Sequence, residues 1–478
     1  MNPLAAQLMG RLERDEADRD ALQQAGDPDP AQAAQAFLRA ARHPDLAGAR
    51  SRWVPELLTS ARPGFGAQCL VELADLSRKQ RGRPLDFADT PALPGLLGSS
   101  NFLARLLLRR PEWIDELKGE IPSPPDPAPV VPDWSEIRRA KYRGLLRVAA
   151  RDLGGRPFAQ SLEELSALAD RCLEAGLACA AEETGVEAPA VFALGKLGGH
   201  ELNFSSDVDL LFLYHPPSGV DPLEHNEAVG RLVRHLKGQF ETPSSEGFAY
   251  RVDLNLRPEG RTGVLANSVD AALGYYESFG AEWERQMLLR LRFVAGPTDA
   301  AADFSQGIIP FVYRRHIDPG VMQNVRDMKA RIEEERRRAG RDIDADVKEG
   351  PGGIRDVEFL VQSFQLFYGG RDPGLRTGNV LEALDVMGRR GLLPEPTVSA
   401  LANAYLWLRR AEHSLQLTEE QQTARFPRER AAQTALARRM GYQEAAAADA
   451  HTHLLDDWTW VRNEVRTHFE ALVLSNRA

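Results

Sequence analysis

The stretch ALGKLGGHELNFSSDVDLLFLYHP, residues 193–216, joins a glycine-rich turn, two serines and two aspartates to a run of apolar residues. Short apolar runs bounded by turns are typical of buried strands, so PAVFALG and VDLLFLY predict two strands on either side of the glycine turn. Side chains at positions i and i+2 of a strand point to the same side. Asp207 and Asp209 are therefore expected to lie together at the start of a buried strand, with Val208 on the opposite face.

Two neighbouring carboxylates repel each other, and partly out of water one of them tends to hold a proton. A divalent cation removes this conflict, because Mg²⁺ prefers hard oxygen ligands, commonly one or two carboxylates plus the phosphates of a substrate. Glycines let backbone N–H groups approach a phosphate, while hydroxyls and an ammonium add donors and charge. The stretch offers Gly195, Lys196, Gly198, Gly199, Ser205 and Ser206 for these roles. The pattern predicts a site for a metal and a nucleotide.

A third acid follows in YRVDLNLRPEG, residues 250–260, where apolar and polar residues alternate as in a half-buried strand. Asp253 and Arg257 fall on the polar face. If this strand lies beside the first, three carboxylates could hold two ions about 3.5–4 Å apart, a geometry that stabilises attacking and leaving oxygens. An isolated Asp-x-Asp pair is most often a turn or solvent-facing acid. Its combination with a glycine turn and an alternating strand favours the metal site, whereas Lys196 and Arg257 fit phosphate contacts or solvated charges.

Composition limits the class of protein. The chain has 478 residues, which suggests two or three domains, and its net charge of −10 argues against general nucleic-acid binding. The three cysteines are unpatterned, so neither a disulfide framework nor a thiolate metal site is expected. We find no signal-peptide pattern and no apolar run of membrane length. These features predict a cytoplasmic protein without membrane or nucleic-acid partners.

The order of patterns along the chain predicts an α+β, mostly helical fold. Residues 1–130 are expected to form a helical region that ends in the proline-rich connection IPSPPDPAPVVPDW. Residues 131–310 should hold the small mixed α/β domain, and residues 311–478 a helical bundle. From about residue 271 onward the chain is expected to be helical almost to its end, with Trp283 and Met287 packed into a core.

A second glycine turn occurs in KEGPGGIRDVEFLVQSFQLF, residues 348–367, and precedes apolar residues at helical spacing. Arg355 and Glu358 are three positions apart, so they could form an ion pair on a helix capped at Gly353. Alternatively, the helix N-terminus faces an anion and Arg355 contacts a phosphate. Pattern alone favours the ion pair, and Gly353, Arg355 and Glu358 remain candidate phosphate-site residues.

Taken together, GKLGGHELNFSSDVDLLFLY and YRVDLNLRPEGRTG resemble the nucleotidyltransferase fold, of the DNA polymerase beta superfamily, in the bifunctional enzymes that adenylylate and deadenylylate glutamine synthetase. FVYRRHIDPGVMQNVRDMKARI, KEGPGGIRDVEFLVQSFQLFYGGRD and YLWLRRAEHSLQLTEEQQT are similar to the first half of those enzymes. The likeness covers about residues 95–430. In that family the N-terminal domain removes AMP from a tyrosine of glutamine synthetase by phosphorolysis, and the C-terminal domain attaches it from ATP.

The resemblance implies that Asp207, Asp209 and Asp253 are catalytic ligands of Mg²⁺, with two ions that Mn²⁺ can replace. Asp253 could instead serve as a base if the reaction ran forward on a tyrosine hydroxyl. The implied partners are glutamine synthetase as the protein substrate, orthophosphate with ADP or ATP, and a regulatory PII signalling protein. Only one glycine turn with an Asp-x-Asp pair occurs in this chain. It is therefore either a separately made N-terminal half or a natural single-activity protein.

Three functions follow as hypotheses. The first is a deadenylylase that acts on modified glutamine synthetase, and the second is an ATP-dependent adenylyltransferase. The third is a catalytically silent module that binds glutamine synthetase or a PII protein. Three acids gathered around one cleft speak against the silent module, because such a module has no need of them.

Overall fold

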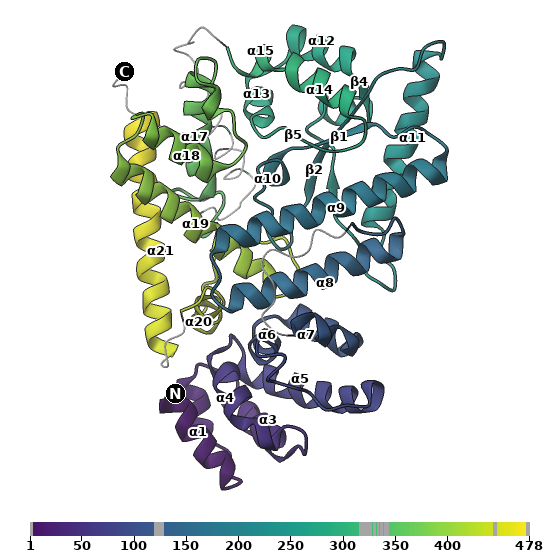
Figure 1. The fold of residues 1–478 in the computed structure, drawn as a ribbon. Coiled ribbons are helices and arrows are strands. Elements are labelled where there is room, and N and C mark those ends of the chain that lie inside the picture. The colour runs from purple at the N-terminus through teal and green to yellow at the C-terminus, as the bar shows by residue number, and fades with distance from the viewer. Residues whose placement is uncertain are drawn as a thin grey trace.

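The computed structural model describes residues 3–118, 129–314, 344–442 and 447–474, together with the separate residues 327, 331, 334 and 338. These residues are mostly helical and form one small mixed sheet. Figure 1 shows the N-terminal helices at the bottom, the sheet with its helices at the upper right and the C-terminal helices at the left. The expected mostly helical fold with a small mixed sheet is confirmed.

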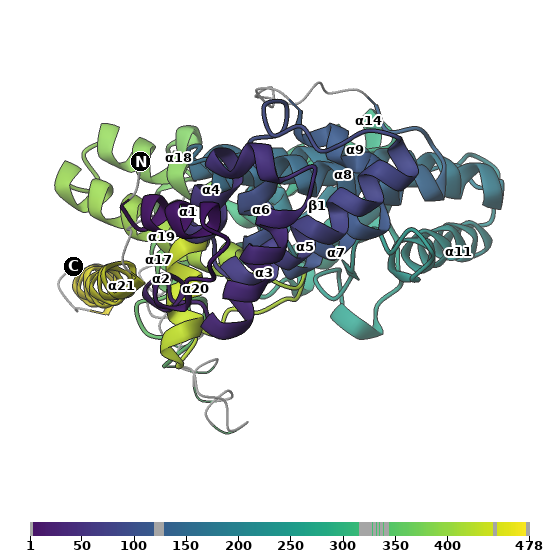
Figure 2. The ribbon, with the colours of Figure 1, turned by 90° about the horizontal axis from the view of Figure 1, so that it is seen from below.

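The N-terminal region is built from short helices. Its last helix begins where the Ser100 hydroxyl oxygen accepts a hydrogen bond from the N–H of Leu103 at 3.1 Å, and it ends just before Pro111. Figure 2, seen from below, shows α1 and α3–α6 in front of the rest of the chain. The elements are α1 (Pro3–Glu13), α2 (Arg19–Gln24), α3 (Pro30–Arg42), η1 (Ala47–Ala49), α4 (Arg50–Thr59), α5 (Pro63–Leu76), η2 (Ser77–Arg81), α6 (Leu93–Ser99), α7 (Asn101–Arg109) and η3 (Pro111–Leu117).

The sheet has the strand order β3-β2-β1-β5, and β4 also pairs with β2. β1 runs antiparallel to β2 and to β5, whereas β2 runs parallel to β3 and to β4. The two strands expected around the glycine turn are confirmed as β1 and β2. The strands are β1 (Ala190–Ala193), β2 (Val208–Tyr214), β3 (Val252–Asp253), β4 (Asn267–Ser268) and β5 (Arg292–Ala295).

Helices cover both faces of the sheet. Leu210 and Phe212 of β2 belong to one buried cluster with α9 and α11, and Leu211 and Leu213 belong to another with α12 and α14. This alternation explains why β2 is a continuous apolar run, since a strand buried on both faces needs apolar residues at every position. The helices are α8 (Trp134–Leu153), α9 (Phe158–Thr184), α10 (Gly195–Gly198), α11 (Pro222–Glu241), η4 (Gly260–Thr262), α12 (Val269–Phe279), α13 (Glu282–Leu288), α14 (Thr298–Gly307) and α15 (Ile309–Val312).

Two expectations about this region are corrected. The alternating strand over residues 250–260 is only two residues long, because the Asp253 carboxylate accepts a hydrogen bond from the N–H of Asn255 at 2.7 Å and turns the chain. The segment after residue 271 is not helical throughout, since Arg292–Ala295 forms β5. β5 pairs with β1, a long-range partner that local patterns do not reveal.

The C-terminal helices have a buried cluster of their own that runs from Val347 to Phe469. Figure 1 shows the long α21 beside α17 and α19, and α18 packs against these two helices. The elements are α17 (Ile354–Tyr368), η5 (Pro373–Leu375), α18 (Val380–Arg389), α19 (Glu395–Leu417), α20 (Arg430–Arg439), α21 (Ala447–Phe469) and η6 (Glu470–Leu474). Most of FVYRRHIDPGVMQNVRDMKARI and most of the proline-rich connection lie outside the described residues.

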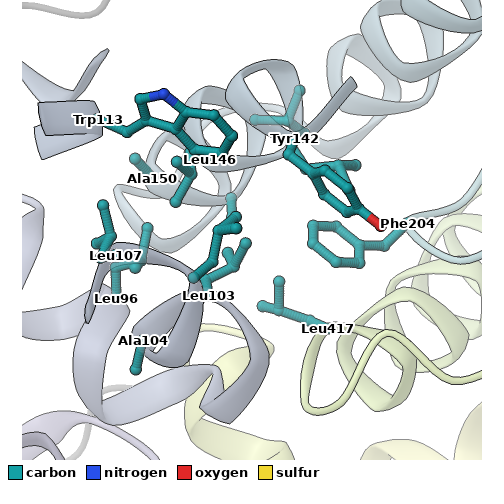
Figure 3. Close-up of a cluster of buried hydrophobic side chains, with 14 of the residues drawn as sticks. Leu96, Leu103, Ala104, Leu107, Trp113, Tyr142, Leu146, Ala150, Phe204 and Leu417 are labelled. Carbon is teal, nitrogen blue, oxygen red and sulfur yellow. The ribbon is translucent and has the colours of Figure 1, made fainter. Parts of the chain in front are cut away.

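A single buried cluster connects the N-terminal helices with the sheet region. Figure 3 shows Leu103 and Leu107 of α7 beside Tyr142 and Leu146 of α8, with Phe204 and Leu417 at the same junction. The boundary placed at residue 130 remains a prediction, as does the one at 310, and the first of them is crossed by this shared core. Across the part of the chain that the structure describes, no helix combines the length and the apolar character needed to cross a bilayer.

Candidate active site

The three predicted acids gather at one end of the sheet. β2 and β3 run parallel, with Val208 opposite Val252 and Asp209 opposite Asp253. Neighbouring strands lie about 4.8 Å apart, so these two aspartates are adjacent, and Asp207 precedes the first residue of β2. The sequence prediction that three carboxylates meet is therefore supported by the strand register.

The pKa of Asp209 reflects this proximity. Burial, and after it the charges of Asp207 and Asp253, raise the pKa of its carboxyl to about 7, while the charges of Lys348 and Lys196 oppose the rise. A buried acid that two others keep from ionising is the donor set that a hard divalent cation fits, because the cation's charge lets all three ionise. The residues present therefore fit Mg²⁺.

The carboxylates are not prearranged as a closed ligand shell. Among the described residues, no group of three or more His, Cys, Asp and Glu side chains meets the geometry of a metal site. Asp207 Oδ1 accepts a hydrogen bond from Gln422 Nε2 at 3.0 Å, and Asp253 Oδ1 accepts one from the N–H of Asn255 at 2.7 Å. Each carboxylate has a second oxygen, so these single hydrogen bonds do not by themselves prevent either side chain from binding an ion together with Asp209.

Gly195 leaves room for the Asp209 carboxylate beside the turn. Its φ is +53°, and a Cβ at this position would lie 2.2 Å from Asp209 Oδ2. The N–H of Leu194 also donates to the Asp209 carbonyl at 2.9 Å. The glycine was predicted to let the backbone approach a phosphate, and in the structure it makes room for a carboxylate.

We expect Gly195→Ala to displace Asp209 and to lower turnover by about tenfold or more. It should also destabilise the fold by about 1–3 kcal/mol, because alanine tolerates neither the positive φ nor the contact. Gly219→Ala is the matched control, since Gly219 has a φ of +81° and open space around its Cβ position. Urea unfolding and steady-state assays separate strain from the contact. Equal effects of the two variants would contradict this account of Gly195.

A cavity of about 920 Å³ opens beside the acids. Asp207 also lines a second cavity, of about 510 Å³, into which Asp253 faces. The lining of the larger cavity includes acids, several cations and apolar side chains. The residues that line it include Gly195, Lys196, Asp207, Asp209, Leu256, Trp283, Met287, Arg290, Lys348, Arg355, Glu358 and Phe359. Trp283 is 42% exposed there, so its expected place in a core is wrong.

Lys196, a predicted phosphate contact, lines this cavity, but its ammonium is already paired. Lys196 Nζ donates to both carboxylate oxygens of Glu412 on α19, each at 2.7 Å. Burial lowers the pKa of this lysine to about 8, although the charge of Glu412 opposes the shift. Lys196 therefore joins the glycine turn to the C-terminal helices, and its charge is shared with Glu412.

A buried ionic network extends this connection. Arg409 of α19 is fully buried; it donates to the Glu201 carbonyl and, at 2.9 Å, to Asn203 Oδ1. The Glu201 carboxylate accepts from the Tyr405 hydroxyl at 3.0 Å and lies 3.2 Å from Arg290 Nη1. The loop between α10 and β2 is thus fixed by α19, which sets the position of the residues leading into Asp207.

Gly198 and Gly199 lie outside the lining of the large cavity. A Cβ on Gly198 would meet the Arg290 carbonyl oxygen at 1.8 Å, and one on Gly199 would meet the Gly378 carbonyl oxygen at 2.6 Å. These glycines allow two backbone segments to pack closely against the turn. Their predicted contact with phosphate has no support from this placement.

Ser205, Ser206 and Arg257 are buried and satisfied by the protein itself. Ser205 Oγ donates to the Glu420 carbonyl at 2.9 Å, and Ser206 Oγ accepts from the N–H of Asn203 at 3.1 Å. The Arg257 guanidinium donates to four carbonyl oxygens of its own loop, including that of Leu254 at 2.6 Å. The structure gives all three a role in shaping the loops around the acids.

The second glycine turn, before α17, forms neither the predicted Arg355–Glu358 ion pair nor an open anion site at the helix N-terminus. The N–H groups of Ile354 and Arg355 donate to the carbonyls of Val347 and Lys348 at 3.0 Å, so the start of α17 at Gly353 does not offer these groups to an anion. The expected Arg355–Glu358 pair is wrong. Arg355 pairs with Glu349 at 2.7 Å, and Glu358 with Arg290 at 3.1 Å. Both Arg355 and Glu358 nevertheless line the cavity.

Sequence reasoning missed Lys348, Glu412, Arg290 and the cavity role of Trp283. One available signal was a polar stripe on α19, where Tyr405, Arg409, Glu412 and Gln416 follow one another at helical spacing and are all buried. A polar stripe at spacings of three and four indicates a helix face that meets charged partners. The partners themselves lie far along the chain, so no local sequence pattern indicates them.

The raised pKa of Asp209 has a measurable consequence for stability. An acid whose pKa rises from 3.8 to about 7 on folding binds more protons in the folded state. The carboxyl therefore has little effect on the free energy of unfolding below pH 4 and lowers it increasingly as the pH rises to 7. In chelator at pH 8, we expect Asp209→Asn to be more stable than wild type by on the order of 2–4 kcal/mol. At pH 4 the two should be equal. Asp385→Asn, at an exposed position, should match wild type throughout. Equal unfolding midpoints for Asp209→Asn and wild type at pH 8 would refute the raised pKa.

Comparison with known proteins bears on this geometry. Residues 91–307 match the family described as glutamate-ammonia ligase adenylyltransferase. Residues 326–473 match a second family, described as GlnD PII-uridylyltransferase. The adenylyltransferase-family match contains all three acids and the glycine turn, and the uridylyltransferase-family match contains Lys348 and Glu412.

Curated relatives carry a related name. Three of them are bifunctional glutamine synthetase adenylyltransferase/adenylyl-removing enzymes. That of Nitrosococcus oceani is 39% identical over 70% of this chain and 36% of its own length. Those of Thioalkalivibrio sulfidiphilus and Stenotrophomonas maltophilia are 36% and 39% identical, over 79% and 74% of this chain and 41% and 40% of their own lengths. The chain thus spans about two fifths of the length of each relative, and these matches confirm the resemblance to bifunctional enzymes of this kind that its motifs suggested.

Proposed function

We propose that this chain removes AMP from an adenylylated tyrosine of glutamine synthetase by phosphorolysis and releases ADP. The observation that carries the proposal is the cluster of Asp207, Asp209 and Asp253 at the edge of a cavity that cationic side chains also line. The names of the relatives cover both attachment and removal of AMP. The choice of removal rests on the likeness of the motifs to the N-terminal half of such enzymes.

The reaction is balanced without a separate base. An oxygen of hydrogen phosphate forms a bond to the α-phosphorus, the bond from that phosphorus to the tyrosine oxygen breaks, and the proton of the phosphate passes to the tyrosine. Because orthophosphate is ionised at neutral pH, the main obstacle is the approach of one anion to another. Divalent ions held by the three aspartates would supply the positive charge that offsets this repulsion and stabilises the leaving oxygen.

The rest of the cavity suits an adenylyl group. Lys348 and Arg355 add positive charge to its polar part, while Trp283, Met287 and Phe359 give it an apolar part able to take a base. Gly195 keeps the Asp209 carboxylate at the polar end. The match of residues 326–473 to a PII-uridylyltransferase family supports a PII protein as a further partner, and the cytoplasm as the place of action follows from these substrates.

The proposal is tested by incubating the chain with adenylylated glutamine synthetase, Mg²⁺ and ³²P-orthophosphate. We expect labelled ADP to form in proportion to the AMP lost from the target. Labelling of unmodified glutamine synthetase from ATP would instead make the chain an adenylyltransferase. Binding to glutamine synthetase with neither reaction would identify the silent module. In each of these two cases phosphorolysis is rejected.

A further inference from the structure

The cations that line the large cavity differ in whether protein carboxylates already hold them. Lys196 pairs with Glu412, Arg355 with Glu349, and Arg290 lies between Glu201 and Glu358. Among the described residues, the side chain of Lys348 makes no hydrogen bond or ion pair, and neither does exposed Arg331. An ammonium without a carboxylate partner keeps its full charge for a ligand.

Lys348 is held in place by its backbone. Its N–H donates to Asp346 Oδ1 at 2.9 Å, and its carbonyl accepts from the N–H of Arg355 at 3.0 Å. The preceding residue, Val347, is fully buried in the C-terminal cluster, and its N–H donates to the Ala424 carbonyl at 2.8 Å. A lysine on a loop fixed at both ends reaches the cavity from a defined direction.

The surroundings of this ammonium are acidic on more than one side. Lys348 lies within electrostatic reach of Asp209 at the sheet and of Glu358 and Glu412 on the C-terminal helices. Glu358 and Glu412 already have their own cations. Lys348 is therefore a cation that the loop before α17 contributes to the cavity that Asp207 and Asp209 also line.

We propose that Lys348 binds a phosphate group of the reactants in the large cavity, from the C-terminal side of the aspartate cluster. The inference rests on the proposed function for the identity of the reactants. The phosphate has two sources, free orthophosphate and the phosphodiester that carries AMP, and both present anionic oxygens that accept from an ammonium. Lys348 would place that group beside the ions held by the aspartates and reduce the repulsion between the two anions.

The experiment measures binding directly. Isothermal titration of inorganic phosphate, AMP and ADP into the Mg²⁺-loaded chain is compared among wild type, Lys348→Gln, Lys348→Arg and Arg389→Gln. Arg389 is the matched control, because it carries one positive charge on α18, is 69% exposed and pairs with Asp385 away from the cavity. A thermal melt of each variant checks the fold, which Lys348→Gln should preserve because it breaks no ion pair.

We expect Lys348→Gln to lower the affinity for at least one of the three ligands by about tenfold or more. Lys348→Arg should retain most of the affinity, and Arg389→Gln should match wild type. Weaker binding of phosphate alone would mean that Lys348 contacts orthophosphate. Weaker binding of AMP alone would mean that it contacts the phosphate of the AMP group. Affinities within twofold of wild type for all three ligands would overturn the inference. Failure of the wild type to bind any of them would overturn it as well.

The labelled-phosphate assay separates this inference from the function on which it rests. If wild type releases labelled ADP and Lys348→Gln keeps the same KM for phosphate and the same ligand affinities, the inference fails and phosphorolysis stands. If wild type releases no ADP but binds AMP in a manner that depends on Lys348, the function fails and the phosphate site stands.

Discussion

Replacing Asp209 by asparagine is expected to lower turnover at least about a thousandfold. The change keeps the shape of the side chain but removes the carboxylate at the centre of the cluster, between Asp207 on its own chain segment and Asp253 on the neighbouring strand. A loss of this size corresponds to about 4 kcal/mol of transition-state stabilisation, which is in the range for removing one electrostatic contact to a reacting phosphate.

The same variant should keep its fold. Without metal its melting temperature is expected to equal or exceed that of wild type, because repulsion among the three acids is relieved. Asp385→Asn, an exposed change of the same chemistry, should keep full activity. A clearly lower melting temperature for Asp209→Asn in chelator, or more than a tenth of wild-type turnover, would show that the acid serves structure.

Arg409→Met is expected to destabilise the chain by about 3–5 kcal/mol, the largest effect on folding that we predict. Arg409 is fully buried, donates to the Tyr405 hydroxyl at 2.7 Å and contacts Glu201 and Glu412. Methionine fills much of the space but removes the positive charge of Arg409. The carboxylates of Glu201 and Glu412 then stay buried with fewer cations to balance their negative charge.

Urea unfolding of Arg409→Met beside Arg389→Met provides the measurement. Arg389 is exposed and pairs with Asp385 at 2.6 Å, so its replacement should cost less than about 1 kcal/mol. Because the network fixes the loop that leads into Asp207, the folded fraction of Arg409→Met should also turn over more slowly. Equal stability of the two variants would mean that the network contributes nothing to holding the loop.

Local patterns were sufficient for β1, β2 and the first two acids. β2 is buried on both faces and therefore apolar throughout, and the two aspartates fall just where that run begins. Asp253 was found because residues 252–254 do alternate in burial, although the strand stops at once when the Asp253 carboxylate turns the chain. In these places the local interaction and the final structure agree.

Local patterns failed where partners come from far along the chain. Ser205 suggested a phosphate ligand, yet its N–H donates to Gln416 Oε1 at 2.9 Å and its hydroxyl to the Glu420 carbonyl. Trp283 suggested a core residue, but its side chain is 42% exposed and lines a cavity. Only tertiary packing decides whether a polar turn or an apolar stripe meets a ligand or the protein.

The central claim is that Asp207, Asp209 and Asp253 together bind divalent ions beside the reacting phosphate. Crystals of the chain soaked with Mn²⁺ and ADP, with anomalous diffraction recorded for manganese, test it most directly. The account predicts anomalous peaks within coordination distance of all three carboxylates, with an ADP phosphate on the same ions. Manganese bound elsewhere, or no peak between β2 and β3 while ADP occupies the cavity, would contradict it.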